Sequence, residues 1–114
     1  MATDQRLKRG DVVLVEIPLS DGHEQHGLRP AILVTGPIRG LVTAIPLTTN
    51  QEALNFPSAL EISPSKSNGL AYPSVALIYQ IRAIDRKRCR TKLGRLSRSD
   101  VASLLKELKS YLGL

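Results

Sequence analysis

Short strand-like segments, each ended by turn-forming residues, are the feature that most constrains how this chain can fold. The first, residues 12–17, is rich in β-branched side chains, follows Gly10 and Asp11, and ends at Pro18. The same pattern recurs along the chain and indicates half-buried strands. It predicts strands at 12–17, 31–35, 42–47, 59–62, 74–84 and 92–96. The strand at 74–84 is mostly apolar, which favours a central position in the sheet.

The last segment of the chain changes its hydrophobic period from that of a strand to that of a helix. Apolar side chains recur at spacings of three and four residues, which places them on one face of a helix. They are Val101, Leu104, Leu105, Leu108, Tyr111 and Leu112. Ser97 and Asp100 resemble a capping box at the start of this helix, and Gly113 ends it. We expect its leucine face to pack on the sheet.

Several short strands followed by one terminal helix predict an α+β domain built on an antiparallel, barrel-like sheet. A chain of 114 residues has room for one such domain, so residues 1–114 are expected to form a single unit.

The charge balance favours a polyanionic partner. The formal net charge is +6 at neutral pH, which suits nucleic acid but equally an acidic protein. Aromatic residues make up only 4% of the chain, which argues against a broad stacking platform for single strands.

Soft metal ligands and membrane-directed segments are scarce in this sequence. With only His23, His26 and Cys89 available, a structural zinc site is not expected, and the single cysteine excludes an internal disulfide. Cys89 lies among cations that would lower its pKa if the thiol faced them, or else it is a small packed residue. No apolar run reaches the length of a membrane span, and residues 1–9 lack the apolar core of a secretory signal, so a cytoplasmic location is expected.

Three blocks of sequence combine glycine, charged and hydroxyl residues with strand-like segments. The first comprises RGDVVLV at 9–15 and GHEQHGLRPAILV at 22–34, and the second is IPLTT at 45–49. The third comprises QIRAID at 80–85 and KLGRL at 92–96. Together these blocks cover nearly the whole chain, and in their order and spacing they resemble the MazF/PemK family of toxins.

The resemblance implies a small SH3-like antiparallel β-barrel with a C-terminal helix, acting as a homodimer. It implies a toxin that an antitoxin with an acidic segment silences. It also implies cleavage of single-stranded RNA without a metal or other cofactor. The ribose 2′-OH would attack its own phosphodiester and leave a 2′,3′-cyclic phosphate and a 5′-OH.

Arg29 and Thr48 are the strongest catalytic candidates. In-line attack adds negative charge to the non-bridging phosphate oxygens, and a metal-free site must meet it with cations and hydrogen-bond donors. Arg29 matches the arginine of the family's Arg-Pro motif, and a guanidinium can grip a phosphate through two hydrogen bonds. Thr48 matches the family's functional threonine and can donate without ionising. Alternatively, Arg29 ties down the loop before it and Thr48 caps its own turn.

The loop before Arg29 supplies two further catalytic candidates. Glu24 could act as general base or hold Arg29 through an ion pair, and His23 titrates near neutral pH and could exchange protons. His26 is expected to be solvated only. Thr49 is expected to assist Thr48 in binding RNA.

The third block contributes candidates for RNA binding. Gln80 matches the family's glutamine and could contact a base or sugar. Tyr79 stands where family members often carry an acidic residue, so it leaves the general base open. It could stack on a base, or simply be a half-buried strand tyrosine.

A basic run follows from Arg82 to Arg98, opposed within the run only by Asp85. Arg82 and Arg86 are its candidates for holding the RNA backbone, although the run could instead receive an acidic antitoxin tail.

Two other functions are compatible with the same fold. One is a CcdB-type toxin that binds gyrase and cuts nothing, although such a protein does not need the Arg29–Thr48 pair. The other is a catalytically inactive SH3-like module that binds RNA or protein, a reading that Tyr79 supports.

Overall fold

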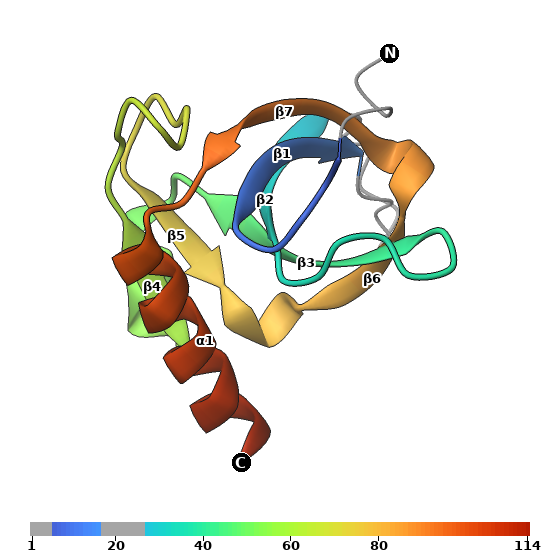
Figure 1. Ribbon diagram of the computed structural model, residues 1–114. Coiled ribbons are helices and arrows are strands. Elements are labelled where there is room, and N and C mark those ends of the chain that lie inside the picture. Colours follow the sequence, from blue (N-terminus) through green and yellow to red (C-terminus); the bar gives the residue numbers. More distant parts are fainter. Residues whose placement is uncertain (1–5, 17–26) are drawn as a thin grey trace.

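The computed structural model describes residues 6–16 and 27–114, and within them the chain forms a curved antiparallel sheet and one α-helix (Figure 1). The strands are β1 (Asp11–Glu16), β2 (Leu28–Leu33), β3 (Leu41–Thr48), β4 (Ala59–Ile62), β5 (Ser74–Leu77), β6 (Arg82–Asp85) and β7 (Cys89–Arg95). Short 3₁₀ turns lie at η2 (Gln51–Asn55), η3 (Ile78–Gln80) and η4 (Arg86–Arg88), and α1 spans Arg98–Leu112. No helix among these residues is long and apolar enough to cross a membrane.

All strand pairs in the sheet are antiparallel, in the order β4-β5-β3-β2-β1-β7. β6 pairs with the first half of β3, on residues that β5 does not reach. The predicted α+β class and terminal helix are confirmed. The sheet curves as a barrel does, but it does not close, because β4 and β7 remain at its two edges.

The prediction of one continuous strand over 74–84 is wrong. β5 and β6 pair with the same strand, β3, but their registers differ by the three residues of η3. Between the two paired stretches of β3 lies Pro46, whose backbone nitrogen has no hydrogen to donate to a ladder. The apolar run in the sequence continues across this interruption, so composition did not reveal it.

The β2 prediction placed the strand start three residues too late. β2 begins at Leu28 rather than Ala31, because residues 28–30 pair with β1. Arg29 and Pro30 therefore lie within a strand, not before one.

The connection between β4 and β5 bridges the two edges of the open sheet. Its Ser67 carbonyl accepts a hydrogen bond from the Arg95 backbone N–H of β7, at 2.7 Å from nitrogen to oxygen. Gly69 and Gly94 let the two backbones approach. A Cβ at Gly94 would collide with the Ser67 carbonyl, and one at Gly69 with the Leu93 carbonyl.

Two hydrophobic clusters occupy opposite faces of the sheet. One includes Leu104 and Leu108 of α1 together with Ile32 and Ile45 of the sheet, and α1 meets the sheet mainly at β4. This confirms that the leucine face of the helix packs on the sheet. The other cluster includes Val13, Ala31, Leu33, Ala44 and Cys89, and lies on the concave side. The Ser97 hydroxyl accepts from the Asp100 N–H at 3.1 Å, and Gly113 ends the helix in the left-handed conformation at φ 76°.

We expect Gly94→Ala to lower the free energy of unfolding by about 1–3 kcal/mol, because the added methyl group forces the β4–β5 connection away from β7. Gly27→Ala is the matched control, since a Cβ there meets no atom of the described residues within 4 Å. Urea unfolding followed by circular dichroism measures both. Equal stability of the two variants would show that the bridge between the edges does not need close backbone contact.

Candidate functional site

Arg29 and Thr48 are brought together by the pairing of β2 with β3. The paired residues are Ala31 with Pro46, Ile32 with Ile45, and Leu33 with Ala44. Continued by two residues, this register places Arg29 opposite Thr48, with both side chains on one face of the sheet. Two residues that are 19 positions apart in the sequence thus become cross-strand neighbours.

Pro30 explains why the strands separate beside this pair. The β2–β3 ladder ends at Ala31, and the next residue of β2 is Pro30, which has no amide hydrogen to continue it. Beyond this point β2 remains paired with β1, whereas its separation from β3 leaves space between Arg29 and Thr48.

That space is a pocket of about 180 Å³. The described residues that line it are Arg29, Pro30, Leu47, Thr48, Thr49 and Ser74. Its volume is below the range of about 300–1,000 Å³ that is usual for drug-sized ligands, so it suits a group of the size of a phosphate. Arg29, Thr48 and Thr49 were predicted from the sequence, whereas Ser74 was not, because it lies far along the chain and belongs to no motif.

The hydroxyl of Thr48 retains its capacity to donate. Thr48 is the last residue of β3, and its Oγ1 accepts a hydrogen bond from the Asn50 N–H at 3.2 Å. This bond is the turn-capping contact expected of a threonine in such a position. A hydroxyl that accepts one hydrogen bond can still donate its own proton to a second group. The Thr48 hydroxyl can therefore cap its own turn and still donate a hydrogen bond to a bound group.

The chemistry available at this pocket is that of anion binding. Arg29 supplies a permanent cation, and the hydroxyls of Thr48 and Thr49 supply neutral donors. Ser74 is buried, and its Oγ donates to the Tyr72 carbonyl at 3.0 Å, so it shapes the wall of the pocket. A tetrahedral phosphate with growing negative charge is the group that such a donor set stabilises.

Glu24, His23 and His26 lie outside the described residues. Their predicted roles as base, proton carrier and solvated loop residue are therefore still predictions from sequence.

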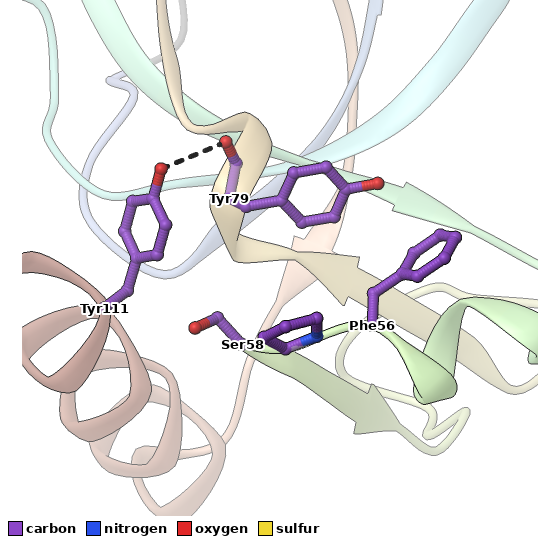
Figure 2. Close-up of a pocket in the computed structure, with 5 residues that line it drawn as sticks. Phe56, Ser58, Tyr79 and Tyr111 are labelled. Carbon is purple, nitrogen blue, oxygen red and sulfur yellow. Dashed lines mark hydrogen bonds between the residues drawn. The ribbon is translucent and has the colours of Figure 1, made fainter.

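Tyr79 and Gln80 lie in η3, away from the Arg29–Thr48 pocket. Tyr79 is exposed and meets Phe56 edge to face, with ring centroids 5.9 Å apart, so it is not the half-buried strand tyrosine considered above. Its hydroxyl accepts from Gln80 Nε2 at 3.2 Å. Figure 2 shows the Tyr111 hydroxyl donating to the Tyr79 carbonyl at 3.5 Å, across an apolar pocket that Phe56 and Ser58 also line.

Several cations of the basic run form ion pairs within the protein, which the sequence did not suggest. Asp85 was its only opposing charge within the run, but β1 provides two more acidic residues. Glu16 pairs with Arg90 at 2.7 Å, and the buried Asp11 lies 3.4 Å from Lys92 and 3.8 Å from Arg95. These cations therefore fasten β7 to β1.

Arg82 and Arg86 lie at increasing distances from the pocket along β3. Arg82 is opposite Ala44, four residues before Thr48, whereas Arg86 lies past the far end of the strand, where its N–H donates to the Gly40 carbonyl. The structure does not gather these two side chains with Arg29.

A second pocket adjoins the first and shares Thr49 with it. Its other described lining residues are Gln51, Glu61, Tyr72 and Pro73. None of these four residues was predicted from the sequence, because three separate segments contribute them and no regular spacing connects them.

Cys89 is a packed residue of the concave cluster. Burial raises the pKa of the Cys89 thiol, and the nearby positive charge of Arg86 opposes this only in part. The predicted alternative, a thiol activated by surrounding cations, is wrong. Within residues 6–16 and 27–114, no three His, Cys, Asp or Glu side chains are grouped as a metal site.

The chain is similar to known toxins over nearly its whole length. Residues 8–112 match the family described as PemK-like, MazF-like toxin of type II toxin-antitoxin system. Endoribonuclease MazF of Staphylococcus epidermidis is 32% identical over 112 residues, covering 95% of this chain and 92% of that protein.

Solved structures agree with this similarity. The crystal structure of MazF from Deinococcus radiodurans has a TM-score of 0.76 and 28% identity, covering 97% of this chain and all of that one. MazF in a MazE–MazF crystal structure from the same organism has the same TM-score and identity, covering 97% of this chain and 99% of that one.

The state of Cys89 can be tested by its reaction with iodoacetamide as a function of pH. The thiolate is the reactive form, and a raised pKa keeps it scarce at neutral pH. We expect alkylation in the folded protein to be slower than for an unstructured cysteine peptide, with its pH profile displaced upward. In urea the rate should match that of the peptide. If the folded protein is alkylated at pH 7 as fast as the peptide or faster, the pKa of the Cys89 thiol is not raised.

Proposed function

This chain belongs to the PemK-like, MazF-like family of type II toxins, and on that premise we propose that it cleaves single-stranded RNA at the pocket between Arg29 and Thr48. The toxin is an endoribonuclease, as its relative from Staphylococcus epidermidis is named. The single observation that carries the location of the site is that the β2–β3 register sets a guanidinium and a hydroxyl across one phosphate-sized pocket.

In the proposed reaction the ribose 2′-oxygen attacks the adjacent phosphorus. A base removes the 2′-OH proton, the bond from phosphorus to the 5′-oxygen breaks, and an acid protonates the leaving 5′-oxygen. The products are a 2′,3′-cyclic phosphate and a 5′-OH. Arg29 binds the non-bridging oxygens, whose negative charge grows in the transition state, and the Thr48 hydroxyl donates to one of them.

We assign the proton transfers to the loop that precedes β2. Glu24 is proposed as the base that accepts the 2′-OH proton, and His23 as the group that returns a proton to the 5′-oxygen. This assignment rests on the sequence, in which both residues lie within six positions of Arg29.

The remaining candidates are proposed to bind RNA outside the reacting phosphate. Thr49 borders the pocket directly. Arg82 and Arg86 would attract the RNA backbone along β6, whereas Tyr79 and Gln80 offer a ring and an amide on η3. Their distance from Arg29 makes them contacts to more remote nucleotides.

We also propose a homodimer that an antitoxin with an acidic segment silences in the cytoplasm. The exposed apolar side chains of Phe56, Tyr111 and Leu112 lie on and beside the end of α1 and would be covered by a second copy of the chain. The net charge of +6 suits an acidic antitoxin segment.

The two alternative functions fit the site less well. A gyrase-binding toxin of the CcdB type has no need of a guanidinium and a hydroxyl aimed into one pocket. The inactive-module hypothesis rested on Tyr79, but Tyr79 does not line this pocket. Its side chain therefore leaves the catalytic arrangement of Arg29 and Thr48 intact.

Cleavage itself is tested with a mixed-sequence RNA in excess EDTA. We expect discrete fragments that end in a cyclic phosphate, because no step of the proposed reaction uses a metal. A substrate with 2′-deoxyribose at the cut position should resist cleavage. If this substrate is cut at the normal rate, the nucleophile is not the 2′-OH. Activity that returns only with a divalent ion would equally refute the mechanism.

Removal of single side chains should separate chemistry from binding. Arg29→Ala should lower kcat by roughly 10²–10³-fold, since it removes a donor to the transition state. Thr48→Val should cause a smaller loss in kcat, whereas Thr48→Ser keeps the hydroxyl and should retain most activity. Arg86→Ala should mainly raise KM and reduce the salt dependence of binding.

The control for loss of charge alone is Arg39→Ala. Arg39 lies on the surface in the turn before β3, and its removal should leave kcat and KM unchanged. If Arg29→Ala and Arg39→Ala have the same kcat, Arg29 is not catalytic.

A further inference from the structure

The pocket that adjoins the catalytic one combines a carboxylate and an amide with an aromatic ring. It is lined by Thr49, Gln51, Glu61, Tyr72 and Pro73, and it shares Thr49 with the Arg29–Thr48 pocket. Pro73 lines this pocket, and the next residue, Ser74, lines the Arg29–Thr48 pocket. The two pockets are therefore contiguous, and a nucleotide whose phosphate binds in one can place its base in the other.

Gln51 presents a fixed acceptor in this pocket. Its Nε2 donates to the Pro73 carbonyl at 3.2 Å and to the Thr49 carbonyl at 3.4 Å. Carbonyl oxygens only accept hydrogen bonds, so the amide nitrogen must face them. The Oε1 atom consequently points away from these two carbonyls and is left to accept.

Glu61 presents a second acceptor. It lies on β4 opposite Val75 of β5, and its side chain is exposed. No cation or donor among residues 6–16 and 27–114 pairs with its carboxylate, in contrast to the paired Glu16 and Asp11. A phosphate is repelled from such a carboxylate, whereas the N–H groups of a base edge are attracted to it.

Tyr72 supplies an aromatic surface at the mouth of the pocket. Tyr72 is 67% exposed, and no aromatic ring among residues 6–16 and 27–114 pairs with it. The Ser74 hydroxyl holds the Tyr72 backbone by donating to its carbonyl at 3.0 Å. Bases of single-stranded RNA commonly stack on exposed aromatic rings of this kind.

We propose that this pocket binds a guanine base next to the scissile phosphate and so sets the cleavage sequence. This inference rests on the proposed function of the Arg29–Thr48 pocket. On its Watson–Crick edge guanine presents two adjacent donors, N1–H and the N2 amino group, which match the two oxygens of one carboxylate. Adenine, cytosine and uracil each present a single donor group on that edge, so their neighbouring acceptor would face the second carboxylate oxygen and be repelled.

The first test maps cleavage sites in a random RNA pool for the wild-type protein and for Glu61→Gln. We expect the wild type to prefer guanine at one nucleotide that flanks the cut. In Glu61→Gln that preference should fall about tenfold, since a bidentate contact contributes roughly 1–3 kcal/mol to discrimination. Glu107→Gln on α1 is the matched control and should keep the wild-type preference.

A second test uses the substrate instead of the protein. Replacing the preferred guanine with inosine removes the N2 amino group, and this should lower kcat/KM severalfold for the wild type but little for Glu61→Gln. Tyr72→Ala should raise KM, and Tyr72→Phe should restore it because the ring remains.

The outcomes separate this proposal from the proposed function. An RNA pool that stays uncut in EDTA refutes the function itself. Cleavage without a guanine preference, or with a preference that Glu61→Gln leaves unchanged, refutes the guanine site alone. Equal sensitivity of the wild type and Glu61→Gln to inosine would also overturn it.

Discussion

The register between β2 and β3 is the constraint on which the candidate site depends. The pairing of Ala31 with Pro46 sets Arg29 across from Thr48, and a slip of one residue would turn Arg29 to the opposite face of the sheet. Buried side chains hold that register, because Ala31 and Leu33 pack in the concave cluster while Ile32 packs in the cluster that includes Leu104 and Leu108 of α1. Pro30 then ends the ladder where the pocket begins. The same packing that stabilises the fold therefore aims the guanidinium.

β3 carries the site because it is the strand with the most partners. It pairs with β2 along one edge, and with β6 and then β5 along the other. Its end at Thr48 is where β2, β3 and β5 meet, so Arg29, Thr48 and Ser74 converge on one pocket. The adjoining pocket arises from the same junction, since β4 and the segment before β5 continue from it. Chemistry and base selection would thus share one rigid platform.

Sequence patterns predicted those parts of the fold that depend on local periodicity. The helix at 98–112, its Ser97 cap and the strand at 59–62 follow from spacing and turn chemistry, and the resemblance selected Arg29 and Thr48. The break at η3 could not be predicted, because it arises from the two different registers that β5 and β6 adopt on β3. The sequence did not predict the ion pair of Asp11 with Lys92, nor the pocket of Gln51, Glu61 and Tyr72, for the same reason. Both the ion pair and the pocket join residues that are distant in sequence and that only the folded sheet brings together.

The central claim is that Arg29 and Thr48 act on the same phosphate, and a double-mutant cycle tests it most directly. Single-turnover cleavage rates would be measured for the wild type, Arg29→Ala, Thr48→Val and the double variant, at saturating protein. Groups that stabilise one transition state together lose their effects non-additively. We therefore predict that the double variant is only slightly slower than Arg29→Ala. A double variant whose rate loss equals the product of the two single losses would show that the residues act independently, and would contradict a shared site.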